Sequence, residues 1–192
     1  MPLILASASP RRSELLHNAA IAFIVEAAHV PEEPFPSENP IDYAQRLAGD
    51  KARAIYERHP DDAVLGADTV VVVGEHLMEK PANELDATRM LRLLSGRRHQ
   101  VITGVCLVAP GFERIEAEIT QVVFSLLSED EIAFYVQTGD PMDKAGAYAI
   151  QGIASRWVDR IEGCYFNVVG LPLPRVHRML RAAEAATGMP LI

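Results

Sequence analysis

The stretch Leu3-Ile-Leu-Ala-Ser-Ala-Ser-Pro-Arg-Arg-Ser-Glu-Leu-Leu16 predicts a short buried strand that leads directly into a helix. Its first residues are apolar, Ser9 is a typical helix N-cap, and Pro10 suits a first helical position that needs no backbone N–H. Arg11 and Arg12 then occupy the first turn, where a cation opposes the helix dipole by about 0.3–1 kcal/mol. A Ser-rich turn, backbone N–H groups and two guanidinium groups favour a polyanion such as phosphate as ligand. The alternative is that both arginines are solvated surface charges.

The length and composition predict one globular domain, or two lobes that share one core, over residues 1–192. The apolar share of 49% and the charged share of 23% are ordinary for a soluble protein. The net charge of −8 makes nonspecific binding to nucleic acid or to an anionic membrane unfavourable, so we expect neither as a partner. An acidic chain that binds phosphates therefore needs a local cluster of cations or a metal ion.

Cysteine usage and hydropathy predict a cytoplasmic protein. Cys106 and Cys164 form no Cys-x-x-Cys pair and indicate no disulfide framework, and Cys106 lies in an apolar run where it is expected to be a small buried hydrophobe. No signal peptide is expected, because the first apolar segment is short and runs directly into the two arginines. No apolar stretch reaches the roughly 18 residues that would span a membrane.

Strand-like and helix-like segments alternate along the chain. The turn Pro110-Gly111 joins two strands that are therefore expected to pair antiparallel, while Asn39 and Asp42 predict the start of the longest helix. Ser128 and Glu131 form a capping box at the start of another. These features predict an α/β fold with a mixed, twisted central sheet flanked by helices. The predicted strands cover residues 3–6, 22–26, 63–73, 99–109, 113–127 and 157–161, and the predicted helices cover 10–18, 40–59, 84–95, 128–137 and 172–188.

Lys51 departs from the apolar pattern of its helix. Apolar residues recur at the spacing of one helix face, which predicts the side packed against the core, and Lys51 falls within that face. One interpretation is that its stem is buried while its ammonium group reaches solvent. The other is that packing holds the lysine and directs it at an anion. The positions on this face are Ala44, Leu47, Ala48, Lys51, Ala52 and Ile55.

Asp68 lies between apolar runs in the predicted strand 63–73. Burying an unpaired carboxylate is costly, so Asp68 needs a cation, a metal ion or several N–H donors. It could make local hydrogen bonds with Thr69 at a bulge. Alternatively, a carboxylate beside the strand kink indicated by Gly66 suits a metal ligand or a general base.

The remaining candidates are polar residues in loops and turns. A long Pro- and Glu-rich loop is often functional, and a glutamine amide can read a base edge through its paired donor and acceptor. For each charged residue the alternative is a solvated surface position. The segment 143–152 is equally well explained as a turn or as a strand. The candidates are Glu32 and Glu33 in the loop 30–39, Lys80 before Pro81, and Lys144 and Gln151 in the segment 143–152.

Several chemistries lack the motifs that they require. The chain contains no P-loop motif, no His-Glu-x-x-His zinc motif and no Gly-x-Ser-x-Gly nucleophile motif. What remains is a set of carboxylates with Arg and Lys, which is the set used in magnesium-assisted phosphoryl or nucleotidyl chemistry.

These residues together resemble the Maf family of nucleoside triphosphate pyrophosphatases. The matching pieces follow the family's order and cover nearly the whole chain. Arg11-Arg12, Ala67-Asp68-Thr69 and Ala149-Ile150-Gln151 are similar to the branch that acts on dTTP and UTP. The full set is Ala6–Leu16, Arg46-Leu-Ala48 with Lys51-Ala52, Gly66–Val70, Glu79-Lys-Pro81, Leu94-Ser-Gly96 with His99, Thr103-Gly-Val105, Asp143–Gly152 and Val168–Leu173.

The resemblance implies two lobes with an active-site cleft and hydrolysis of the α–β phosphoanhydride bond. It implies Asp68, Lys51 and Glu32 as catalytic residues, with Glu32 favoured over its neighbour Glu33 as the loop carboxylate. Mg²⁺ or Mn²⁺ would be held by Glu32 and Asp68. A homodimer is a further expectation from the family. The residues implied in binding and selecting the nucleotide are Ser7, Arg11, Arg12, Thr69, Lys80, Lys144 and Gln151.

Three other functions compete with this expectation. One is a pyrophosphatase of the 7-methyl-GTP type, and another is a nucleotide-binding regulator of septation without turnover. A binder without turnover has no need of Asp68, which repels phosphate unless a metal ion intervenes. A nucleic-acid-binding protein is disfavoured by the acidic charge and by the lack of a basic stripe.

Overall fold

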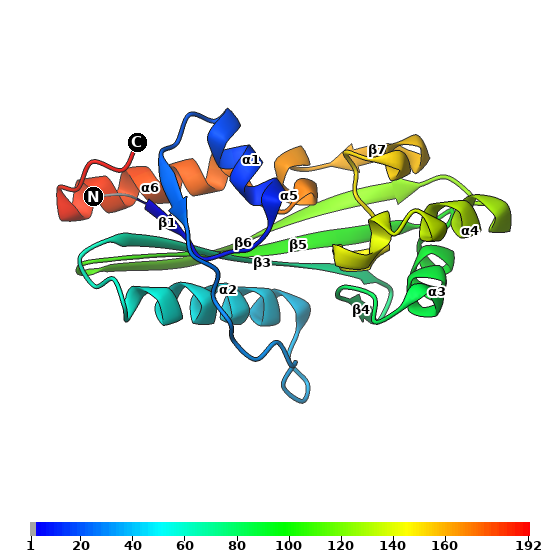
Figure 1. Ribbon diagram of the computed structural model, residues 1–192, viewed down its shortest axis with the longest axis horizontal. Helices are drawn as coiled ribbons and strands as arrows, with labels where there is room; N and C mark the ends of the chain where they lie inside the picture. The colour runs from blue at the N-terminus through cyan, green and yellow to red at the C-terminus, as the bar shows by residue number, and fades with distance from the viewer. Residues whose placement is uncertain (1–2) are drawn as a thin grey trace. The chain divides into compact units, whose positions relative to one another are not determined.

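The computed structural model describes residues 3–192, whose strands form one mixed seven-stranded sheet (Figure 1). The strand order is β2-β1-β3-β5-β6-β7, and β4 pairs with β3. This confirms the α/β class with a mixed sheet flanked by helices. The strands are β1 (Leu3–Leu5), β2 (Phe23–Val25), β3 (Ala63–Val73), β4 (His76–Met78), β5 (Arg98–Ala109), β6 (Phe112–Phe124) and β7 (Val158–Glu162). The α-helices are α1 (Pro10–Asn18), α2 (Pro40–Tyr56), α3 (Glu84–Leu94), α4 (Glu129–Gln137), α5 (Tyr165–Val169) and α6 (Leu173–Thr187).

The connections explain why the sheet is mixed. β1 pairs in parallel with β2 and β3, with Leu3 opposite Phe23 and Ala63. Parallel neighbours need a crossover, which α1 supplies between β1 and β2. The pairs β3–β4 and β6–β7 are antiparallel.

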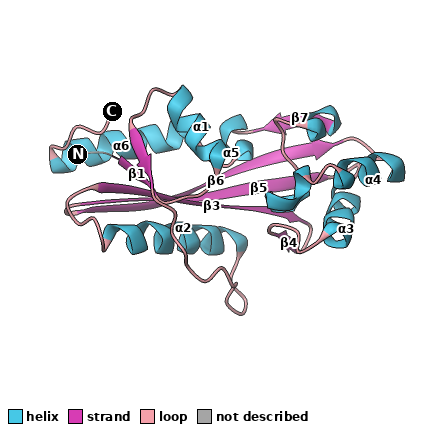
Figure 2. Cartoon of the chain, viewed as in Figure 1, coloured by secondary structure: helices cyan, strands magenta, loops and turns pink. Residues whose placement is uncertain are grey.

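Residues of the chain gather into two compact units. The first unit comprises the chain up to Asp68 together with Thr103–Glu118 and Gly170–Ile192. The second unit comprises Thr69–Ile102 and Ile119–Val169. The long strands β3, β5 and β6, drawn in magenta in Figure 2, each contribute residues to both units.

In the first unit, α2 covers one side of the strands while α1 and α6 lie on the other (Figure 1). Ala48, Ala52 and Ile55 of α2 pack against buried residues of β1, β3 and β5. Cys106 belongs to this core, as predicted, and burial raises the pKa of its thiol to about 12.

Two glycines allow α2 to approach the sheet this closely. A Cβ atom at Gly66 would lie 2.1 Å from the backbone oxygen of Ala48, and one at Gly104 would lie 2.1 Å from that of Ala44. Both distances are far below van der Waals contact. A glycine inside a strand indicates a bulge or a close backbone approach, and at Gly66 the structure shows the close approach.

Most predicted helix signals are present, and the differences are local. The Asn39 side chain caps α2 by accepting from Ile41 N and Asp42 N, and Ser128 forms its capping box. α2 ends at Tyr56 rather than residue 59, and the short elements β4 and α5 were not predicted, because three and five residues show no hydrophobic period. Within residues 3–192, no helix is both long and apolar enough to cross a membrane.

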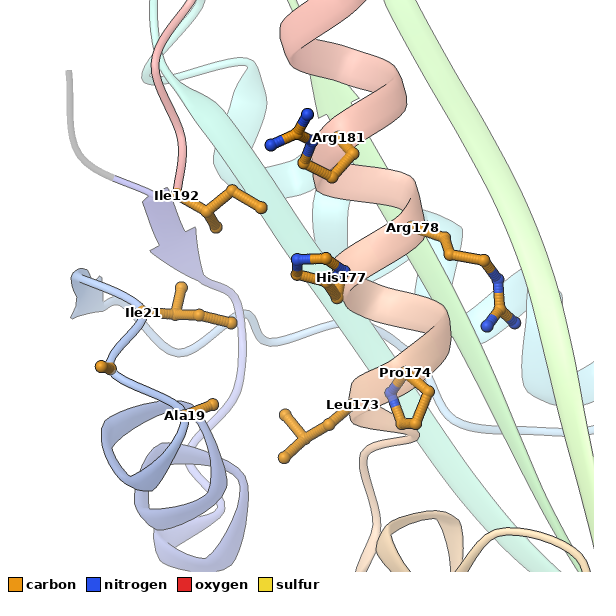
Figure 3. Close-up of a pocket in the computed structure, with 9 residues that line it drawn as sticks. Ala19, Ile21, Leu173, Pro174, His177, Arg178, Arg181 and Ile192 are labelled. Carbon is orange, nitrogen blue, oxygen red and sulfur yellow. The ribbon is translucent and has the colours of Figure 1, made fainter.

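A pocket of about 690 Å³ lies in the first unit beside α6 (Figure 3). Ile21 and Ile192 point toward α6 in this view, and His177 lies between them and the helix backbone. None of the predicted site residues lines this pocket. Its lining residues are Ala19, Ala20, Ile21, Leu173, Pro174, His177, Arg178, Arg181 and Ile192.

The second unit contains a buried aromatic cluster around His99. His99 Nε2 lies 2.8 Å from the hydroxyl of Tyr148, and edge-to-face contacts join its ring to those of Phe124 and Tyr148. His99 is only 2% exposed. Burial lowers its pKa to about 4, so the folded protein holds this histidine neutral at pH 7.

We expect His99 to make the protein less stable in mild acid. As pH falls below 6.5, the unfolded chain takes up a proton on this histidine, whereas the folded chain does so only near its pKa of about 4. The contribution is complete above pH 6.5, and about 2 kcal/mol of it is lost between pH 7 and pH 5. Urea unfolding of the wild type and His99→Gln at both pH values measures this. The variant should lose about that much less stability, and equal losses in both proteins would contradict the assignment.

Candidate active site

Lys51 and Asp68, the two residues that depart from apolar patterns in the sequence, contact each other in the first unit. Lys51 Nζ on α2 donates to Asp68 Oδ1 on β3 at 2.6 Å, and it also lies 2.6 Å from Glu32 Oε1. The side chains of Lys51 and Asp68 are 10% and 11% exposed, and that of Glu32 is 44% exposed. Lys51 therefore does not extend into solvent. Its ammonium group lies between a buried carboxylate and a partly exposed one.

The burial of Asp68 changes its acidity. Burial raises the pKa of Asp68 above its ordinary value, and the cations Lys51 and Arg12 oppose part of that rise. A carboxylate whose pKa is raised accepts a proton more readily than a solvated one, as a general base must. Of the partners expected for Asp68, which were a cation, a metal ion or several N–H donors, Lys51 supplies a cation.

Arg12 joins three separate segments of the first unit. Its Nη1 donates to Ser7 Oγ and to the backbone oxygen of Ala67, each at 3.0 Å, and its Nε donates to Gly170 O at 2.8 Å. Burial lowers the pKa of Arg12, with the neighbouring Asp68 acting in the opposite direction, and a guanidinium stays charged in either case. Arg12 therefore holds the peptide that immediately precedes Asp68.

The turn before α1 is organised by Ser7 rather than by Ser9. Ser9 occupies the N-cap position, as predicted, although its side chain makes no capping hydrogen bond. Instead, Ser7 Oγ accepts from Ser9 N at 3.2 Å and from Arg12. Arg11 is half-buried on α1, and its charge contributes to the lowered pKa of Arg12.

Of the two adjacent glutamates in the loop 30–39, Glu32 reaches the site. Its side chain contacts Lys51, while its backbone oxygen accepts from Tyr43 Oη at 2.7 Å. Glu33 is exposed, and its backbone oxygen accepts from Arg46 Nη2 at 3.0 Å.

The charges and donors of this site fit a divalent ion that binds together with a phosphate ligand. Glu32 and Asp68 already share one cation, the Lys51 ammonium group, and with Arg12 the four groups carry no net charge. A polyphosphate therefore needs additional positive charge here. Mg²⁺ takes one or two carboxylates together with phosphate oxygens and water. Within residues 3–192, no cluster of three His, Cys, Asp or Glu side chains offers a cage made by the protein alone.

Four predicted site residues belong to the second unit. Thr69 follows Asp68 directly and is half-buried in β3, whereas Lys80 and Gln151 are exposed. Lys144 is buried, and its ammonium group contacts Asp143 Oδ1 at 2.6 Å and Asp140 Oδ1 at 3.0 Å and donates to Asp140 O. Lys144 thus binds its own turn, and a role for it in substrate binding stays a prediction.

Tyr43 and Arg46 are residues of this site that the analysis of side-chain chemistry missed. Both lie on α2 and hold the backbone of the loop that carries Glu32. In the sequence, Arg46 stands out only as part of the motif Arg46-Leu-Ala48. One signal in the sequence could have indicated its contact with the loop. Arg46 directly precedes the core position Leu47, and the acidic loop 30–39 comes shortly before it in the chain.

Known proteins are similar to this chain along nearly its whole length. The sequence model of Maf-like proteins matches residues 2–183. A dTTP/UTP pyrophosphatase from Koribacter versatilis (strain Ellin345) is 61% identical over 183 residues, which cover 95% of each chain. One from Geobacter sulfurreducens (strain ATCC 51573 / DSM 12127 / PCA) is 53% identical, covering 95% of this chain and 97% of its own. One from Geobacillus sp. (strain WCH70) is 49% identical, covering 93% and 96%.

Proposed function

The chain belongs to the Maf family, and from this we propose that it is a nucleoside triphosphate pyrophosphatase that hydrolyses dTTP and UTP to the monophosphate and pyrophosphate. The observation that carries the proposal is the contact of one buried ammonium group, that of Lys51, with the carboxylates of Asp68 and Glu32. A site that only bound a nucleotide would have no need of a buried carboxylate, which repels phosphate unless a metal ion intervenes. A hydrolase needs a base for the attacking water.

In this mechanism Asp68 removes a proton from the water that attacks the α–β phosphoanhydride. Its raised pKa suits that role, and the Lys51 contact orients the carboxylate. Arg12 keeps the peptide before Asp68 in place through Ala67 O. The water oxygen bonds to the attacked phosphorus as the bond from that phosphorus to the bridging oxygen breaks. The two products are the nucleoside monophosphate and pyrophosphate.

Charge neutralisation accompanies this step. Arg11, Arg12, Lys51 and Lys80 would bind the triphosphate and oppose the charge that develops on its oxygens, with Ser7 and backbone N–H groups assisting. When bound, Mg²⁺ or Mn²⁺ would be held by Glu32 and Asp68 and would polarise the phosphate oxygens. Thr69 and Gln151 would read the pyrimidine base. A cytoplasmic location and a homodimer stay predictions.

We expect purified protein to release pyrophosphate from dTTP and UTP in the presence of Mg²⁺ or Mn²⁺, and to release little from other triphosphates. The measurement is pyrophosphate formation from a panel of nucleotides that includes 7-methyl-GTP, with the metal or with a chelator. Release from none of them would contradict the enzyme and favour a nucleotide-binding regulator. A preference for 7-methyl-GTP would place the chain in the other branch.

A further inference from the structure

We propose that Arg46 is a positioning residue for this reaction, which fixes the loop 30–39 so that Glu32 reaches Lys51. The inference rests on the proposed function, because Glu32 acts in that reaction. Arg46 lies outside the cluster of Glu32, Lys51 and Asp68. It positions Glu32 by binding the loop that carries this glutamate.

Arg46 contacts the loop 30–39 at two places, the backbone of Glu33 and the side chain of Glu38. Its guanidinium binds Glu38 in a bidentate arrangement, with Nε 2.7 Å from Oε1 and Nη2 2.7 Å from Oε2. The same Nη2 donates to Glu33 O at 3.0 Å. One side chain on α2 thus binds the residue next to Glu32 and a residue near the end of the loop.

An aromatic contact completes this attachment. The guanidinium carbon of Arg46 lies 4.0 Å from the ring centre of Phe35, within the range of a cation–π contact. Glu38 in turn accepts from Phe35 N at 3.0 Å, so the turn that carries this ring is closed by the carboxylate that Arg46 binds. The Glu38 side chain is only 8% exposed, which limits the screening of the ion pair by solvent.

The loop is irregular and exposed. No helix or strand is present between residues 26 and 39, and residues 31 to 37 are all exposed. Its contacts with α2 include those of Tyr43 and Arg46 with its backbone and that of Lys51 with the Glu32 side chain. Without Arg46, we expect Glu32 to sample positions away from Lys51. Such misplacement is costly, since a shift of about 1 Å can lower a rate by a factor of about 100.

Lysine cannot reproduce this arrangement. An ammonium group is a compact charge without a planar fork, so it cannot bind both Glu38 oxygens in parallel and stack on Phe35. Arg46→Lys should therefore retain only part of the kcat that is lost in Arg46→Met.

The test compares Arg46→Met with Arg53→Met. Arg53 also lies on α2 and pairs with a glutamate, at 2.6 Å from Glu113, and each arginine approaches Asp50. Both ion-pair partners of Arg53, Glu113 and Asp50, belong to segments outside the loop 30–39. We expect Arg46→Met to lower kcat by about 10- to 100-fold and Arg53→Met to leave it within about twofold of wild type. Hydrogen exchange of the amides in 30–39 should become about tenfold faster in Arg46→Met alone.

A double variant tests whether Arg46 acts through Glu32. If it does, Arg46→Met combined with Glu32→Gln should be no slower than Glu32→Gln alone, because the positioned group is already lost. A further fall in kcat would overturn the proposal, as would equal activity and exchange in Arg46→Met and Arg53→Met. Glu38→Gln removes the partner without touching α2 and replaces Arg46→Met if that variant does not fold. If the wild type hydrolyses neither nucleotide, the proposed function fails, and the exchange data still decide whether Arg46 holds the loop.

Discussion

Asp68→Asn is expected to lower kcat for dTTP and UTP by about 10²- to 10⁴-fold. Asparagine has nearly the same shape and can still accept a hydrogen bond from Lys51, but its amide cannot take a proton from water. The loss corresponds to about 3–5 kcal/mol of transition-state stabilisation. Single-turnover and steady-state pyrophosphate release measure it. Unchanged activity in the variant would show that another group is the base.

The pH dependence of the same pair of proteins separates a base from a merely structural carboxylate. Below its pKa, Asp68 is protonated and cannot accept a proton, so kcat/KM should rise with pH through that value. Because burial raises the pKa, this acid limb should lie above the ordinary aspartate value of 3.8. In Asp68→Asn the limb should be absent from the residual activity. A limb of unchanged position in the variant would assign it to a different group.

The stability of this variant should not fall with its activity. A raised carboxyl pKa means that the folded state holds the proton more tightly than the unfolded chain. The stabilising contribution is then complete below pH 3.8 and is lost as the pH rises through the folded pKa. Ionised Asp68 thus weakens the fold at neutral pH, and we expect Asp68→Asn to unfold at the same urea concentration as wild type or a higher one.

Gly66→Ala is expected to destabilise the protein by about 3 kcal/mol or more and to abolish most activity. The added Cβ would lie 2.1 Å from Ala48 O and 2.8 Å from Ala52 N, and both are backbone atoms of α2 that no rotamer change can remove. α2 would have to move away from β3. That movement would separate Lys51 from Asp68, because each side chain belongs to one of the two elements.

Gly74→Ala is the matched control for this variant. Gly74 has a positive φ of 58° and no atom within 4 Å of the added Cβ, so alanine there carries only the backbone strain of about 1–2 kcal/mol. Gly66 has no positive φ, so an alanine there would be opposed by the lack of space and not by backbone strain. Chemical unfolding of both variants compares the two effects. A cost at Gly66 no larger than at Gly74 would contradict the close approach of α2.

The part of the site that the sequence could predict consists of residues that break a local pattern. Lys51 in an apolar helix face and Asp68 in a buried strand each required a partner, and each proved to be the partner of the other. The same reasoning applied to the fold, because Asn39, Ser128 and Gly66 carry local signals that do not depend on distant residues.

The remainder depended on contacts between distant segments. Arg12 has an acceptor at Gly170, far along the chain, and nothing in the sequence near Arg12 indicates that contact. Arg46 and Tyr43 lie in an ordinary amphipathic helix, so their contacts with the backbone of the loop leave no periodic signal. Lys144 was expected among the residues that bind or select the nucleotide, and in the structure its ammonium group contacts acceptors of its own turn.

α2 holds the acidic loop 30–39 and also carries Lys51, and this limits how the protein can vary in length. Inserting or deleting one residue in a helix rotates everything beyond it by about 100°. Between Tyr43 and Lys51, such a change would keep either the contacts with the loop or the contact with Asp68, and would lose the other. We therefore expect insertions and deletions among related chains, and in engineered variants, to occur before Asn39 or after Tyr56 and not within this segment of α2.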